Sequence, residues 1–111
     1  MFKINGTTMY LTRGDTLDVT VTILNADGSV YTPVTGDQVR FAVKSTYKDQ
    51  RTILNVDIPT DTLRLRVESD DTKKFTARKE PYVYDIQLTK EDGTVDTFID
   101  CAQLYITEEV E

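Results

Sequence analysis

Two stretches of the chain place an Asp-Gly pair between runs of alternating apolar and polar residues. Asp27-Gly28 follows a run that starts at Leu17, and Asp92-Gly93 follows a run that starts at Tyr82. Gly adopts positive φ without steric cost and Asp tolerates it, so such pairs are typical of tight turns between antiparallel strands. The two turns therefore predict β-hairpins and constrain the chain to a fold built from antiparallel strands.

Alternation of apolar and polar residues also recurs outside these two turns. A period of two is the pattern of a strand with one buried face, and turn residues separate the runs. The sequence predicts strands or strand fragments over residues 2–4, 9–11, 17–23, 30–31, 39–43, 53–58, 63–67, 82–88 and 95–106. In the last run, Val95, Thr97 and Ile99 share one phase, and Ala102, Leu104 and Ile106 share the other. The phase slips near Asp100-Cys101, which predicts a β-bulge there.

One segment interrupts the β rhythm. Residues 69–75 read Ser-Asp-Asp-Thr-Lys-Lys-Phe, with acidic residues before basic ones, as the helix dipole favours. We expect one helical turn near residues 70–75, crossing between two sheets, with Ser69 or Asp70 as its N-cap.

Seven or eight short strands at spacings near ten residues, with no sustained helical pattern, predict an all-β fold. The predicted architecture is an immunoglobulin-like antiparallel β-sandwich, although the Cys…Trp…Cys core mark of antibody domains is missing. Tyr82 or Tyr84 is a candidate for a tyrosine corner. The length predicts a single domain over residues 1–111, with residues 108–111 as a frayed tail.

Composition argues against several functions. The net charge is −6, with +1 in residues 1–55 and −7 in residues 56–111, so neither nucleic acid nor an anionic membrane is an expected partner. There is no histidine, no phosphate-binding loop and no nucleophile motif, which predicts a protein that is not an enzyme and has no catalytic residue, metal or cofactor. Neither a signal peptide nor a membrane span is expected. The lone cysteine, Cys101, is expected to be buried and unreactive.

Two further motifs have plain structural interpretations. Arg13-Gly14-Asp15 matches the tripeptide that integrins recognise, but it also reads as a turn before a strand. Aspartates at 92, 96 and 100, and at 57 and 61, could supply oxygen ligands to calcium, but their spacing is not that of an EF-hand. Solvated strand faces and turns account for them.

Tyrosines are the candidates for contact with a partner. Six of the ten aromatic residues are tyrosine, which combines an apolar ring with a polar tip and is favoured at interfaces. Tyr31, Tyr47 and Tyr105 fall at loop or solvent-phase positions of the predicted strands. We therefore expect these three to contact a partner.

Three segments together carry a family resemblance. They are Leu11–Thr16 before an alternating strand, Gly36–Lys44, and Tyr82–Leu88 continuing to Asp92-Gly93. In this order they resemble small immunoglobulin-like proteins of tailed bacteriophages and of prophages in Gram-positive bacteria. They are also similar to the N-terminal domain of upper baseplate proteins, over roughly residues 8–107. Those baseplate proteins usually continue into a stalk or receptor-binding region, and this chain ends at Glu111.

The resemblance implies a structural or assembly protein of a phage or prophage virion, of the tail or baseplate type. Its partners would be other phage structural proteins, or further copies of itself, and it would be assembled into the virion in the bacterial cytoplasm. Sheet edges and loops would make the contacts. The alternative is a bacterial cell-surface or carbohydrate-binding β-sandwich module.

Overall fold

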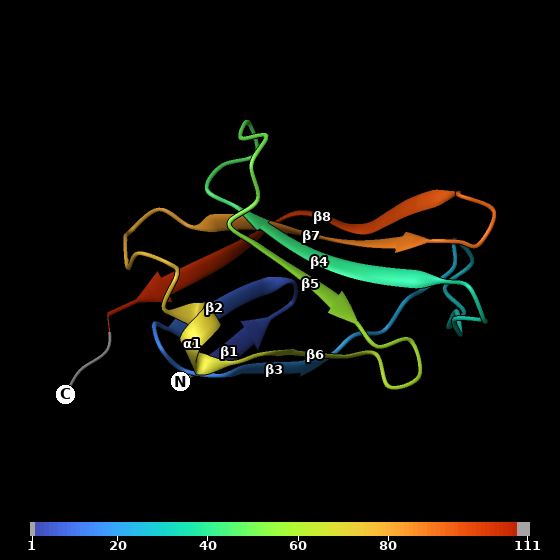
Figure 1. Cartoon of the computed structure of the whole chain (residues 1–111), viewed down its shortest axis with the longest axis horizontal. Coiled ribbons are helices and arrows are strands. Elements are labelled where there is room, and N and C mark those ends of the chain that lie inside the picture. The colour runs from blue at the N-terminus through green and yellow to red at the C-terminus, as the bar shows by residue number, and fades with distance from the viewer. Residues whose placement is uncertain (1, 109–111) are drawn as a thin grey trace.

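The structure is a computed structural model that describes residues 2–108 (Figure 1). The predicted frayed tail thus lies, apart from Glu108, outside the described residues. Of the residues described, 49% are in strands or bridges and 4% in helix. The elements are β1 (Phe2–Asn5), β2 (Thr8–Thr12), β3 (Leu17–Thr20), β4 (Gln38–Lys44), β5 (Leu54–Ile58), β6 (Arg64–Val67), α1 (Ser69–Thr72), β7 (Tyr82–Thr89) and β8 (Val95–Thr107).

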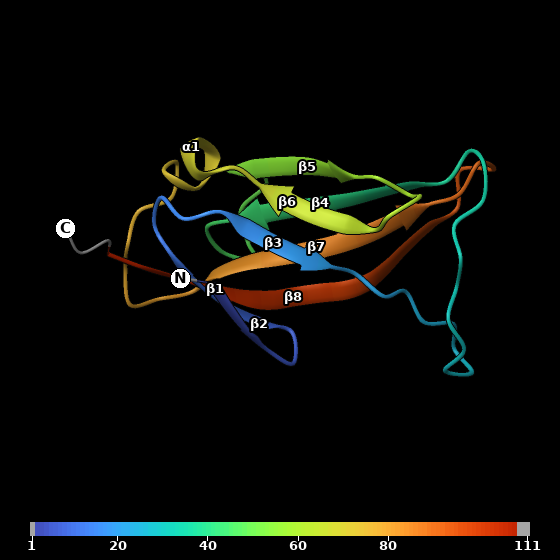
Figure 2. The ribbon, with the colours of Figure 1, turned by 90° about the horizontal axis from the view of Figure 1, so that it is seen from below.

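The strands form two facing layers. Six strands make the larger sheet in the order β1-β2-β8-β7-β4-β5, and β3 pairs with β6 in the smaller one. Figure 2 shows β3 and β6 lying in front of the larger sheet. Pairing of β3 with β6, and of β7 with β4 on one side and β8 on the other, follows the immunoglobulin arrangement. The predicted all-β sandwich is confirmed.

One strand pair departs from the prediction of an antiparallel fold. β2 runs parallel to β8, with Met9 beside Leu104 and Thr12 beside Thr107. The other strand pairs between described residues are antiparallel. Local turn signals could not reveal this pairing, because it joins the two ends of the chain without a turn between them.

Both Asp-Gly turns are present and have the same geometry. In the first turn, Asn25 N–H donates to Ser29 O (2.8 Å) and Gly28 N–H donates to Asn25 O (2.9 Å). In the second turn, Lys90 N–H donates to Thr94 O (2.8 Å) and Gly93 N–H donates to Lys90 O (2.9 Å). Only the glycines have positive φ, 88° and 90°. Each Asp instead accepts the backbone N–H two residues ahead, at 2.9 Å. The turns are therefore three-residue loops with a glycine bulge, one of the common hairpin forms.

The core lies between the two sheets and follows the predicted alternation. Phe41, Val43 and Leu65 have no exposed surface, and Tyr84 is 1% exposed. Burial of each such side chain is worth roughly 1.5–3 kcal/mol. Other buried apolar residues are Met9, Leu11, Leu17, Val21, Ile23, Val39, Leu54, Ile58, Val67, Phe75, Tyr82, Ile86, Leu88, Ala102, Leu104 and Ile106.

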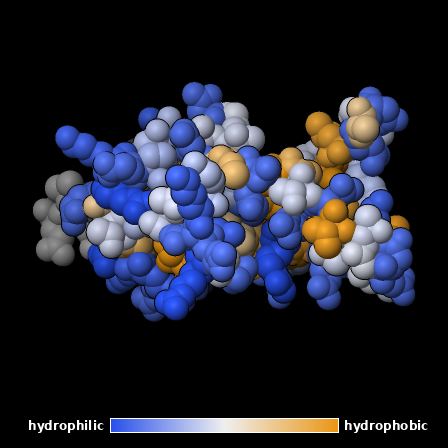
Figure 3. All heavy atoms as spheres, turned by 90° about the horizontal axis from the view of Figure 1, so that it is seen from above, coloured by the Kyte–Doolittle hydropathy of each residue, from blue (hydrophilic) through white to orange (hydrophobic). Residues whose placement is uncertain are grey.

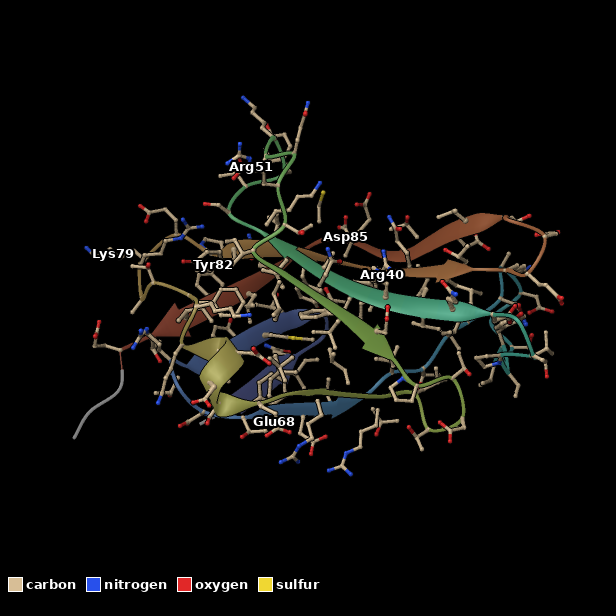
Figure 4. The ribbon with its side chains drawn as sticks, viewed as in Figure 1. Arg40, Arg51, Glu68, Lys79, Tyr82 and Asp85 are labelled. Carbon is tan, nitrogen blue, oxygen red and sulfur yellow. The ribbon has the colours of Figure 1, made fainter. Side chains whose placement is uncertain are left out.

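Tyr82 makes the tyrosine corner. Its hydroxyl donates to Thr76 O (3.0 Å) and accepts from Thr76 N–H (2.9 Å). Its ring packs against Phe75 and lies 3.8 Å beneath the guanidinium of Arg78, which in turn donates to Ser45 O (2.7 Å). Figure 4 shows Tyr82 at the start of β7, close to the segment that follows α1. The corner fixes the crossing from the small sheet to the large one.

The predicted helical turn is present, but its cap is not the predicted one. α1 spans Ser69–Thr72, and its N-cap is Glu68, without a side-chain hydrogen bond. Neither Ser69 nor Asp70 can be the N-cap, because the chain reaches helical geometry one residue earlier. Thr72 is buried and donates to Asp15 O at 2.8 Å. This bond ties α1 to the turn before β3.

The Arg13-Gly14-Asp15 segment has the geometry of a turn. Asp15 N–H donates to Thr12 O (3.0 Å), and Gly14 has a φ of 88°. The Arg13 guanidinium donates to Phe75 O and Lys73 O, each at 2.9 Å. The tripeptide thus connects β2 to β3 and is joined to the end of α1, as its structural interpretation requires.

β8 contains the predicted bulge and a second one. Ile99 opposes Ile86 and Ala102 opposes Tyr84, so Asp100 and Cys101 together oppose the single residue Asp85. A second shift, between Thr97 and Ile99, leaves Phe98 as an extra residue. Cys101 has a φ of 49° and is exposed. The prediction of a buried thiol was wrong, because the bulge turns this side chain away from the core.

The two sheets differ greatly in length. β8 has 13 residues, whereas β3 and β6 have four each. At about 3.3 Å per residue these lengths are roughly 43 Å and 13 Å. The longest dimension of the molecule is 45 Å. The small sheet therefore covers only part of the large one, and the rest is faced by the segment that joins β3 to β4 (Figure 2).

Candidate interaction surface

The uncovered part of the sandwich is built from two segments. Residues 21–37 connect β3 to β4, and residues 85–101 form the part of the β7–β8 ribbon that includes its turn. We call these two segments together the distal half. Figures 1 and 2 show them at the same end of the molecule. The first segment carries its own hairpin, closed by a bridge between Leu24 and Val30.

Exposed apolar side chains gather in the distal half. Leu24, Val30, Val34 and Val95 are 56%, 65%, 62% and 56% exposed. Figure 3 shows apolar side chains on the surface at this end of the molecule. Val95 was predicted to share a phase with Thr97 and Ile99. Because it pairs with Thr89 beyond the cover of the small sheet, it stays in solvent. Exposed apolar groups that gather on one surface are typical of sites that contact another molecule.

A groove separates the two segments of the distal half. It has a volume of about 360 Å³ and lies between residues 23–26 and the β7–β8 ribbon. Ile23, Leu88 and Phe98 give it apolar walls, and Lys90 and Asp96 add charges. Ile23 and Leu88 belong to the buried core, so the groove opens directly from it.

One buried carboxylate organises the base of the distal half. Asp37 is 8% exposed and accepts from the Tyr31 hydroxyl (2.6 Å) and from Val34 N–H (3.0 Å). The hydrogen bond from Tyr31 lowers the pKa of Asp37, and Val34 N–H and Lys90 add to this effect. Lys90 also lies 5.5 Å from the centre of the Tyr31 ring. These contacts hold residues 31–37 against the β7–β8 turn.

The distal half carries the net charge of the whole chain. Residues 85–101 contain five acidic side chains and one basic side chain, and residues 21–37 contain two acidic and no basic ones. Their combined charge is −6, and the rest of the chain is neutral, with twelve side chains of each sign. The surface is therefore apolar and acidic at once.

The distal half also exposes the edge of a strand. β8 pairs with β7 from Val95 to Leu104, but β2 covers its other side only from Leu104 to Thr107. Within residues 2–108, no strand pairs with that side between Val95 and Gln103. An unpaired edge offers backbone N–H and C=O groups to an incoming strand.

The three tyrosines chosen from the sequence lie on different parts of the fold. Tyr31 is half-buried in the distal half, where it bonds to Asp37. Tyr47 is 66% exposed in the loop between β4 and β5. Tyr105 is half-buried on β8 and stacks on Tyr10 of β2, with ring centres 5.3 Å apart and planes 9° apart. The structure does not bring them together, and their role as contacts stays a prediction.

The aspartates considered for calcium are also dispersed. Asp92 caps the β7–β8 turn, whereas Asp57 lies on the edge strand β5 and pairs with Arg40 of β4 at 3.3 Å. Among residues 2–108, three potential ligands do come together: Asp85, Asp100 and Cys101 have ligand atoms within 4.8 Å of one another. Figure 4 shows Asp85 on the face of the large sheet that points away from β3 and β6. It accepts Cys101 N–H at 2.8 Å, which stabilises the bulge.

Sequence reasoning missed the apolar and acidic distal half. Of its four exposed apolar residues, Val30 and Val95 lie at the starts of predicted strands, and Leu24 and Val34 lie outside the predicted strands. The available signal was the presence of Val and Leu within loops that contain several acidic residues. These residues indicate a shared surface only when it is known which loops lie at the same end of the sandwich, and that depends on tertiary structure.

The comparisons with known proteins do not add an assignment. No protein-family model matches the chain, and no match was found among curated proteins. In residues 2–108, no helix is long and apolar enough to cross a membrane.

Proposed function

We propose that this chain is a non-catalytic structural or assembly protein of a phage or prophage virion, of the tail or baseplate type. The observation that carries the proposal is the distal half, whose exposed apolar side chains and net negative charge lie on a sandwich that the rest of the chain already stabilises. Such a surface suits contact with another protein. The resemblance to immunoglobulin-like phage proteins supplies the setting.

Purified particles provide the direct test. Prophages of the source strain would be induced, and the particles would be isolated by density gradient and examined by mass spectrometry. We expect peptides of this chain to co-sediment with the capsid and tail proteins in a fixed ratio. Recovery of the chain only in the soluble fraction would contradict the proposal.

A surface variant links this test to the structure. Val34→Asp places a charge at a side chain that is 62% exposed in the distal half, and it should reduce incorporation into particles. Ile4→Asp is the matched control, because Ile4 is 46% exposed on β1, outside the distal half. Equal incorporation of the two variants would show that the distal half is not the contact surface.

A carbohydrate-binding role is the second candidate, favoured by the stacked pair of Tyr10 and Tyr105. The pair lies on neighbouring strands, and Tyr10 lines a groove of about 370 Å³. Affinity electrophoresis in gels that contain bacterial cell-wall polysaccharide separates the two functions. Retardation that is lost in Tyr10→Ala would favour this candidate, and unchanged mobility would exclude it for that polysaccharide.

A further inference from the structure

We propose that the free edge of β8, from Val95 to Gln103, binds an extended segment of a partner protein as an added strand, and that this segment is basic and apolar. The inference deepens the proposed function, because it names the site and the chemistry of the contact.

The edge has the length and position that strand addition needs. Nine residues of β8 extend beyond its pairing with β2. Because two of them are extra residues at the bulges, they run beside seven residues of β7, Val83–Thr89, and present roughly 23 Å of strand at about 3.3 Å per residue. An added strand would continue the six-stranded sheet in line with β2, and its main-chain hydrogen bonds would be independent of partner sequence.

The groove beside the edge provides selectivity for side chains. Asp96 and Phe98 of β8 both line it, opposite Ile23 and Leu24. Alternate residues of an added strand point to opposite faces of the sheet. One set of its side chains would therefore enter the groove and bury apolar surface against Phe98, Ile23 and Leu24. The partner segment should alternate apolar residues with residues of another kind.

The charge of the edge indicates that the residues alternating with the apolar ones in the partner segment are basic. Asp100 lies close to Asp85, which is on the face of the sheet that points away from β3 and β6 and therefore away from the groove, and the distal half has a net charge of −6. Lysine or arginine on the added strand would face these carboxylates, and opposite charges on neighbouring strands contribute roughly 0.2–1 kcal/mol per pair. Electrostatic attraction would also speed the encounter.

The same charges disfavour a second copy of this chain as the occupant. An antiparallel pair of β8 edges centred on Phe98 would oppose Asp96 to Asp100 twice. Like charges directly opposite each other destabilise a strand pair. Acidic residues on the edge thus act against self-pairing and leave it open to a basic segment.

Two synthetic peptides of equal composition test the proposal on the full chain. One alternates valine and lysine over eight residues, and the other has four valines followed by four lysines. Binding is followed by fluorescence anisotropy, and the site by hydrogen exchange of backbone amides. We expect the alternating peptide to bind at least about tenfold more tightly than the block peptide and to protect amides within residues 95–103.

A matched pair of variants locates the interaction. Asp96→Lys with Asp100→Lys should weaken binding of the alternating peptide by about tenfold or more. Asp49→Lys with Asp61→Lys changes the charge equally at exposed positions outside the distal half, and it should leave binding within about twofold. Circular dichroism and thermal unfolding establish that both variants are folded.

Three outcomes would overturn the proposal: equal binding of the two peptides, no protection of residues 95–103, or equal loss of binding in both charge variants. A second copy of the chain would be identified as the occupant by two changes at high protein concentration without peptide. The β-strand signal in circular dichroism would increase, and the same amides would become protected from exchange. These results do not depend on particle composition. Failure here with incorporation into virions would leave the proposed function standing with another contact surface.

Discussion

The tyrosine corner allows a sharp test of what holds the crossing between the two sheets. Tyr82→Phe removes one hydroxyl and keeps the ring, which is 4% exposed between Phe75 and Arg78. Two hydrogen bonds to Thr76 are lost, at 2.9 and 3.0 Å. Each is worth about 1 kcal/mol net, for a sum of about 2 kcal/mol. Because Thr76 is exposed, water can replace part of the lost hydrogen bonding. We therefore expect the free energy of unfolding to fall by about 1–2 kcal/mol.

Urea unfolding followed by far-ultraviolet circular dichroism measures this loss, since the chain has no tryptophan to report on unfolding. The midpoint should fall while the slope m stays unchanged, because the variant exposes the same surface on unfolding. Tyr47→Phe is the control at a side chain that is 66% exposed, and it should change stability by less than about 0.5 kcal/mol. Equal stability of the two variants would refute the reasoning that the corner holds the crossing.

Three further predictions concern the distal half and β8. Asp37 has a lowered pKa in the folded state, so its stabilisation is present above its unfolded pKa and is lost as the pH falls through its folded pKa. Asp37→Asn should therefore show a shallower loss of urea stability between pH 5 and pH 3 than the parent chain, and an identical slope would contradict this assignment. The exposed Cys101 should react with a maleimide in the folded protein. The reaction rate should rise steeply in alkaline solution, because the hydrogen bond with Asp100 raises the pKa of the thiol. A thiol that reacts only after unfolding would contradict its exposure. Gly93→Ala should lower the free energy of unfolding in urea by about 1–2 kcal/mol, because Gly93 has a φ of 90° that strains an alanine. Outside the neighbouring residues no atom lies within 4 Å of the added carbon, so a steric clash does not contribute. Unchanged stability would show that the turn relaxes.

The local features of the fold were readable from the sequence for local physical reasons. The Asp-Gly turns depend on the φ of one glycine and on one side-chain hydrogen bond, and both lie within five residues. The strands follow from a period of two, and the bulge at Asp100-Cys101 from a break in that period. The predicted corner followed from the position of Tyr82 just after the helical turn.

Features that depend on tertiary contacts were not readable. Parallel pairing of Met9 with Leu104 has no local signal, because neither strand differs in pattern from one in an antiparallel pair. The exposure of Cys101 depends on which side of the bulge faces solvent. The helical turn that begins after Glu68 is joined to a distant segment by the hydrogen bond from Thr72 to Asp15 O, a contact that has no local signal in the sequence.

Because the two sheets differ in length, the residues that stabilise the fold and the residues available for contact with a partner lie in different parts of this molecule. The fully buried side chains, such as Phe41 and Leu65, lie where the small sheet faces the large one, and their loss would cost several kcal/mol. Val30 and Val34 lie beyond that cover and are more than 60% exposed, so their replacement removes little buried surface. Changes at such positions are usually within about 0.5 kcal/mol. The exposed apolar positions of the distal half can therefore vary without loss of the fold, so a binding defect caused by a change at one of them is interpretable as loss of contact.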